Sequence, residues 1–140
     1  MAQIMPEIWV DDVGDALRYY EEVLGFNRRL AIPGEGGKVV HAEVDFNGSN
    51  PIMIAWAVES PGAVDAVLEK LRKGGNRGSG ILLYVNIGDA DIDAYHEKVV
   101  AKGAKVVEPL RDQFYGDRTF RIEDPFGFVL TFARHIGEGH

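Results

Sequence analysis

The sequence contains no cysteine, which excludes disulfide bonds, thiolate nucleophiles and cysteine-based zinc sites. Basic residues are also few: 15 lysines and arginines face 22 aspartates and glutamates, for a formal net charge of -7. An acidic surface repels phosphate backbones and anionic membranes, so no nucleic acid and no membrane is expected as a partner. Such a surface attracts cationic small molecules, although its simpler explanation is solubility.

Long apolar stretches are missing as well. No apolar run approaches the ~20 residues that span a bilayer. The stretch "MAQIMPEIWVDDV" lacks the basic and apolar regions of a signal peptide. Together with the missing cysteines, these features agree with a cytoplasmic protein.

Apolar side chains are nevertheless plentiful enough for a core. Of the 140 residues, 46% are hydrophobic, which fits one compact domain or two small intertwined modules. Alternation and turn residues predict, in the N-terminal half, strands over 3–10, 39–46 and 51–58, a strand and turn over 27–38, and a helix over 11–26. Asp12 or Asp15 can cap this helix, and Gly25 ends it.

The same pattern returns in the C-terminal half, after a predicted helix over 60–73 and a glycine-rich linker over 74–80. It predicts strands over 81–88, 104–113, 118–124 and 128–135, with a helix over 89–103. A shift of 75 residues superposes Trp9 on Tyr84 and Tyr20 on Tyr95, and "DFNG" later corresponds to "DPFG". This is an internal repeat of a strand–helix–three-strand unit.

Neither repeat closes its sheet alone, because exposed edges and one apolar face remain. We therefore expect a single domain over 1–140. It would comprise an N-terminal module (1–58), a helix and linker (59–79) and a C-terminal module (80–135).

Several short motifs make the chain similar to the vicinal oxygen chelate superfamily, which includes glyoxalase I, extradiol dioxygenases, fosfomycin-resistance transferases and bleomycin-resistance proteins. The motifs are Val10-Asp11-Asp12, Tyr19-Tyr20, Leu24-Gly25-Phe26, "YGDR" at 115–118 and "DPFG" at 124–127. "YGDR" with "DPFG" most resembles the small bleomycin-resistance-like branch. The resemblance implies an α+β fold in which paired βαβββ modules form a curved mixed sheet around a cavity. It also implies a homodimer, but it constrains function weakly, because one fold hosts many activities.

Metal-using members of this superfamily carry His, Gln or Glu at four strand positions. The resemblance places these positions at Met5, at Ile52 or Ile54, at Gly80 and at Thr131. None of these residues suits zinc, iron, nickel or manganese, so we expect no metal and no cofactor.

Without a metal, binding or catalysis would depend on other side chains. The candidate ligand-binding residues are Glu7, Trp9, His41, Trp56, Tyr84, Tyr115 and Arg118. The Glu7 carboxylate, beside Trp9, can serve as a general base, bind a ligand ammonium group, or form a structural pair with an arginine. His41 and Glu43 lie on the non-core face of their strand, which is either a cavity wall or plain solvent. For Arg118, a structural role next to Asp117 is the more usual interpretation.

Two classes of function follow. We favour metal-free binding, or sequestration, of a small cationic or aromatic molecule such as an antibiotic, which would make the protein an antibiotic-resistance protein. The alternative is a metal-independent isomerase or lyase with Glu7 as general base. A glyoxalase-type metal lyase becomes the alternative if the alignment of the four positions is wrong.

Overall fold

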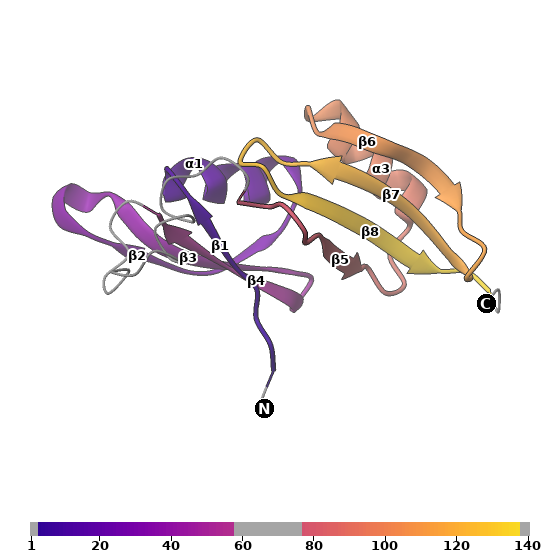
Figure 1. The fold of residues 1–140 in the computed structure, drawn as a ribbon, viewed down its shortest axis with the longest axis horizontal. Helices are drawn as coiled ribbons and strands as arrows, with labels where there is room; N and C mark the ends of the chain where they lie inside the picture. Colours follow the sequence, from indigo (N-terminus) through magenta and orange to yellow (C-terminus); the bar gives the residue numbers. More distant parts are fainter. Residues whose placement is uncertain (1–2, 58–76, 138–140) are drawn as a thin grey trace. The chain divides into compact units, whose positions relative to one another are not determined.

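The structure is a computed structural model that describes residues 3–57 and 77–137. It divides into two units, Met1–Arg77 and Gly78–His140, each built on a four-stranded sheet (Figure 1). The predicted helix over 60–73 and the first part of the glycine-rich linker lie outside the described residues. The predicted joining of the two halves around one cavity stays a prediction. In the described part of the chain, no helix combines the length and the apolar character needed to cross a membrane.

The N-terminal unit has a mixed sheet in the order β1-β4-β3-β2, with β1 parallel to β4 and the other neighbours antiparallel. Its strands are β1 (Glu7–Val10), β2 (Asn27–Pro33), β3 (Val39–Phe46) and β4 (Ser49–Trp56). Between β1 and β2 lie helix α1 (Val13–Arg18) and a π-helical turn (Tyr19–Val23), and a short 3-10 turn (Glu35–Gly37) precedes β3.

Helix α1 begins and ends where the sequence predicts. The Asp12 carboxylate accepts a hydrogen bond from the Asp15 backbone N–H at 2.9 Å, which satisfies one free donor of the first turn. Gly25 has a φ of 74°, a conformation that glycine adopts without strain, and it ends the helical segment. α1 packs on β3 and β4 through apolar residues of the alternating core face.

The first strand is shorter than predicted, because it begins at Glu7 rather than at residue 3. Pro6 has no backbone N–H, so it contributes only its carbonyl, which accepts from the Met53 N–H at 2.9 Å. Ile4, within the predicted strand, lies outside β1 and is 96% exposed.

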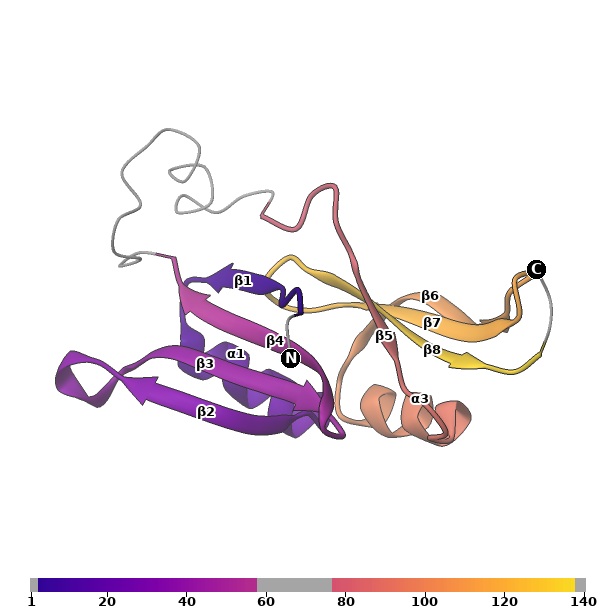
Figure 2. The same ribbon diagram turned by 90° about the horizontal axis from the view of Figure 1, so that it is seen from below.

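The C-terminal unit repeats this topology in the order β5-β8-β7-β6, with β5 parallel to β8. Its elements are β5 (Leu83–Asn86), α3 (Ile92–Ala101), β6 (Lys105–Asp112), β7 (Asp117–Glu123) and β8 (Val129–His135). Helix α3 is capped by Asp91 and lies along one face of this sheet, as α1 does in the other unit (Figure 2).

In each unit, one face of the sheet packs on the helix, and we call the opposite one the open face. Paired residues of neighbouring strands project to the same side, so the ladder registers define both open faces. The N-terminal open face carries Glu7, Trp9, Leu30, Ile32, His41, Glu43, Met53 and Ala55. The C-terminal open face carries Tyr84, Glu108, Asp117, Thr119, Arg121, Glu123, Val129, Thr131, Ala133 and His135.

Candidate functional site

A row of hydrogen-bonded side chains crosses the C-terminal open face. Thr131 in β8 is fully buried, and its hydroxyl oxygen accepts a hydrogen bond from Arg121 Nε of β7 at 3.0 Å. Arg121 Nη1 donates to Glu108 Oε2 of β6 at 2.8 Å. The three residues are direct ladder partners, so the strands hold the arginine between a hydroxyl and a carboxylate.

Glu108 is shared with a second arginine. Arg111 Nη2 lies 2.9 Å from Glu108 Oε1, and Gln113 Nε2 donates to the same oxygen at 3.4 Å. Gln113 also donates to the Thr119 hydroxyl at 3.0 Å. Two guanidinium groups therefore face one carboxylate, and the cluster has one positive charge in excess.

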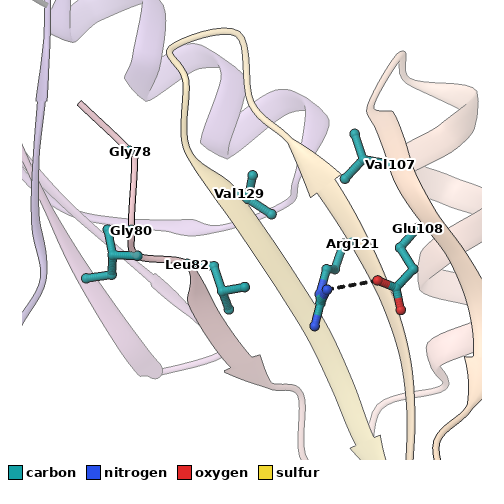
Figure 3. Close-up of a pocket in the computed structure, with 8 residues that line it drawn as sticks. Gly78, Gly80, Leu82, Val107, Glu108, Arg121 and Val129 are labelled. Atoms are coloured by element: carbon teal, nitrogen blue, oxygen red, sulfur yellow. Dashed lines mark hydrogen bonds and ion pairs between the residues drawn. The ribbon is translucent and has the colours of Figure 1, made fainter. Parts of the chain in front are cut away.

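A pocket of about 530 Å³ lies beside this row. It is lined by Gly78, Gly80, Ile81, Leu82, Val107, Glu108, Arg121 and Val129. Figure 3 shows the guanidinium of Arg121 turned toward the Glu108 carboxylate, with apolar side chains around the pair. The pocket thus combines an apolar lining with one fixed pair of charged groups, as small-molecule sites commonly do.

Tyr84 in β5, the ladder partner of Thr131, begins this row. Its hydroxyl donates to Asp117 Oδ2 at 2.5 Å, and His135 Nδ1 lies 3.1 Å from Asp117 Oδ1. Desolvation and this hydrogen bond raise the pKa of Tyr84 well above its usual value, with a further contribution from Tyr115. The hydrogen bond from Tyr84, and then that from His135, lower the pKa of Asp117. Tyr84 is therefore a neutral donor rather than a base.

Of the predicted site residues in the N-terminal unit, the structure brings three together. Trp9 Nε1 donates to Glu7 Oε1 at 2.8 Å, and the Glu7 side chain is exposed. His41 lies on the same open face, because both Trp9 and His41 pair with Ala55. Their roles in binding stay predictions.

Trp56 and Arg118 lie on the other faces of their sheets. Trp56 is two residues from the buried Ile54 in β4, so both side chains point to the same face of the sheet. The Lys38 ammonium lies 4.5 Å from the centroid of the Trp56 ring. Arg118 is likewise two residues from the buried Phe120 in β7, so it points to the face that packs on the helix. A tryptophan and an arginine that sit on the helix side are separated from the open faces by the sheet itself.

Arg118 is instead held by two carboxylates. Its Nη2 lies 2.8 Å from Asp93 Oδ1 of α3, and its Nη1 lies 2.9 Å from Asp112 Oδ1 of β6. These hydrogen bonds, first to Asp93 and then to Asp112, raise the pKa of Arg118, so it stays charged. The contacts connect helix and sheet, which agrees with the structural interpretation made from the sequence.

A model of the glyoxalase/bleomycin resistance protein/dioxygenase superfamily matches residues 1–132. The chain belongs to this superfamily. This confirms the resemblance and the α+β fold class drawn from the sequence motifs.

Three relatives show the similarity at low sequence identity. Mb0911c, an uncharacterized protein of Mycobacterium bovis, is 27% identical over 135 residues that cover 96% of this chain and 84% of that protein. The crystal structure of TioX from Micromonospora sp. ML1 has a TM-score of 0.71 at 25% identity, and the similarity covers 97% of this chain and all of that one. TnmS3, an antibiotic binding protein from Streptomyces sp. CB03234, has a TM-score of 0.65 at 20% identity and covers 96% and 97% of the two chains. The likeness to TnmS3 shows the fold alone.

The superfamily's metal positions can now be placed on the strands. Ile52 and Ile54 were the predicted counterparts of Thr131, but both are buried on the helix side of β4. In the ladders, Trp9 pairs with Ala55 as Tyr84 pairs with Thr131, so Ala55 is the counterpart. The alignment at this position was wrong, because ten residues separate Asp45 from Ala55, whereas seven separate Asp124 from Thr131.

The corrected donor set does not fit a divalent metal. It consists of a thioether, a methyl group, a glycine and a hydroxyl, from Met5, Ala55, Gly80 and Thr131. The Thr131 hydroxyl already accepts from Arg121, whose positive charge would repel a cation at this place. Within residues 3–57 and 77–137, no group of three or more His, Asp or Glu side chains could hold a metal ion.

The sequence analysis missed Arg121, Glu108 and their contact with Thr131. A signal was available for Arg121, because "RTFRIED" alternates and places Arg121 opposite the buried Phe120 and Ile122. No such signal pointed to Glu108, since register shifts on both sides of it in β6 decide where it lies.

Proposed function

We propose that this protein binds a small organic molecule without a metal ion and sequesters it unchanged. The observation that carries the proposal is the Arg121–Thr131 hydrogen bond of 3.0 Å. At the position where metal-using relatives carry a metal ligand, this chain has the Thr131 hydroxyl, which accepts a hydrogen bond from the Arg121 guanidinium group. The pocket beside it, about 530 Å³, falls within the usual size of small-molecule sites, roughly 300–1,000 Å³.

Sequestration of an antibiotic is the specific form of binding that we propose. TnmS3, which shares the fold, is an antibiotic binding protein, so the fold is compatible with this use. Within the C-terminal unit, the exposed side chains of Tyr84, Leu82 and Val107 suit a ligand with an apolar or aromatic surface.

A metal-independent isomerase or lyase with Glu7 as general base has less support. A general base must be positioned against the proton that it removes, and the exposed Glu7 side chain is not among the residues that line the pocket. Its hydrogen bond from Trp9 also occupies one of the carboxylate oxygens.

The metal-free proposal predicts the result of a simple titration. Untagged protein should copurify with no stoichiometric zinc, nickel, manganese or iron by elemental analysis. Addition of each ion should leave the thermal midpoint unchanged, because only a ligand that binds the folded state raises it. One metal per chain, together with a raised midpoint and turnover of a substrate, would contradict the proposal.

We also propose that two copies of the chain associate, as the family resemblance implies. Multi-angle light scattering after size-exclusion chromatography should give twice the chain mass of 15.4 kDa at micromolar concentration. A monomer mass at all concentrations tested would exclude the homodimer.

A further inference from the structure

We propose that the pocket of the C-terminal unit selects molecules that carry one anionic group on an apolar body, and that Arg121 determines this selectivity. The inference rests on the proposed binding function and assigns a chemical class to the ligand.

The Arg121 side chain is ordered in a position from which it can bind an anion. Its Nε and Nη1 are fixed by Thr131 and Glu108, at 3.0 and 2.8 Å, so the guanidinium plane is set by two strands. Among the described residues, no hydrogen bond is formed by its Nη2. The side chain keeps 37% of its surface exposed and lines the pocket. A guanidinium that is already ordered loses little conformational entropy when an oxyanion binds.

The local charge favours an anion in spite of Glu108. That carboxylate is engaged by both Arg111 and Arg121, at 2.9 and 2.8 Å, so the cluster keeps one positive charge in excess. The neighbouring pair of Lys105 and Glu123, 2.8 Å apart, adds no net charge. A positive cluster stands out on a chain whose formal net charge is -7.

The rest of the pocket offers apolar surface for the body of the ligand. The exposed fractions of Ile81, Leu82 and Val107 are 61%, 41% and 49%. In Figure 3, Leu82, Val129 and Val107 surround the charged pair. Such side chains near one oriented polar group define a site for an amphipathic molecule.

Gly78 fixes this wall of the pocket in place. A methyl group at Gly78 would come within 2.1 Å of the Gly127 carbonyl oxygen, so the segment can approach the β7–β8 turn this closely only as glycine. The apolar residues that follow, Ile81 and Leu82, are thereby held beside β8.

This assignment differs from the cationic ligand expected from net charge. Glu7, the carboxylate that was expected to bind an ammonium group, belongs to the open face of the other unit. The charge around this pocket has the opposite sign.

A pair of dyes that share one ring system tests the proposal. The anionic probe is 8-anilinonaphthalene-1-sulfonate, and the neutral probe is N-phenyl-1-naphthylamine, which lacks only the sulfonate. Fluorescence titration of the full chain should give at least about tenfold tighter binding of the sulfonate, since charge-assisted hydrogen bonds are the strong ones. The Arg121→Met variant should bind the two dyes equally.

Two further variants serve as controls. Arg111→Met removes the excess positive charge of the cluster but leaves the Arg121 guanidinium in the pocket, so it should weaken sulfonate binding less than Arg121→Met does and leave a preference for the sulfonate. Arg121→Lys keeps the charge without the planar fork and should retain part of the preference, so the test stands even if Arg121→Met does not fold. Circular dichroism melting curves establish which variants are folded.

The outcomes separate this inference from the proposed function. Equal binding of the two dyes by the unmodified protein, or an undiminished preference in Arg121→Met, overturns the anionic selectivity while binding itself stands. Failure of both dyes to bind also overturns it. A different result would contradict the proposed function, namely one bound metal ion per chain together with turnover of a substrate.

Discussion

The two units place different chemistry on the same scaffold. In each sheet, four ladder partners form a row across the open face, from the first strand of the unit to the second. The rows are Trp9–Ala55–His41–Ile32 in the N-terminal unit and Tyr84–Thr131–Arg121–Glu108 in the C-terminal unit. Both begin with an aromatic residue and continue with a small one, so the repeat in the sequence is a repeat of positions in space.

The two rows differ in the hydrogen bonds that their side chains form with one another. In the C-terminal row, Arg121 is hydrogen-bonded to both of its neighbours. In the N-terminal row, Ala55 has no polar group to offer, and Ile32 is apolar and 47% exposed. A fixed polar network gives orientation and specificity, whereas an unpaired apolar surface adapts to many shapes. For this reason we place the proposed selectivity on the C-terminal face.

The largest expected effect on stability concerns Asp45 and Asp124, which occupy corresponding positions in the "DFNG" and "DPFG" turns of the two units. Asp124 is buried, and its Oδ1 accepts from the Phe126 and Phe128 backbone N–H groups, both at 2.9 Å. The Asp124→Ala change leaves both donors without this acceptor and should lower the free energy of unfolding by about 3 kcal/mol. Urea denaturation followed by circular dichroism measures the loss.

The matched change in the other unit should cost less. The Asp45 carboxylate accepts from the Gly48 N–H and from Arg29 Nε, both at 2.8 Å, but Gly48 and part of Arg29 are open to water. Water can replace those contacts, so Asp45→Ala should cost about 1–2 kcal/mol. Equal losses in the two variants would show that the two turns are energetically equivalent.

The turns were predictable from the sequence because their chemistry is local. "DFNG" and "DPFG" each supply an aspartate that binds turn N–H groups and a glycine with positive φ, 85° at Gly48 and 97° at Gly127. The helix caps at Asp12 and Asp91 depend on a contact only three residues away and are equally local.

The rows were not predictable, because they depend on register. A one-residue shift moves a side chain to the opposite face of a sheet, and such shifts occur between Val44 and Phe46 and on both sides of Glu108. The chain also has three more residues between Asp45 and Ala55 than between Asp124 and Thr131, so counting from Asp45 arrived at Ile52, in the core, instead of Ala55. The contact between Arg121 and Glu108, 13 residues apart, was beyond sequence reasoning because of the register shifts beside Glu108.

The smallest expected effect concerns the aromatic residues that begin the two rows. Tyr84→Phe removes the hydrogen bond to Asp117 and should lower stability by about 1 kcal/mol at pH 7. In the other row, Glu7→Ala removes the acceptor of the Trp9 indole N–H at an exposed position and should cost less. Melting curves of the two variants at one pH compare the rows directly.

The pH dependence distinguishes the Tyr84 hydrogen bond from a mere change in packing. The pKa of Asp117 is lowered in the fold, chiefly by Tyr84 and further by His135, so its stabilisation is present above its unfolded pKa, about 3.9, and is lost as pH falls through its folded pKa. Tyr84→Phe should raise the pKa of Asp117 toward its ordinary value, which carbon-detected NMR of the carboxyl group can follow. Its destabilising effect should therefore be larger at pH 7 than at pH 3. An effect of the same size at both pH values would mean that the contribution of the Tyr84 hydroxyl does not depend on the charge of Asp117.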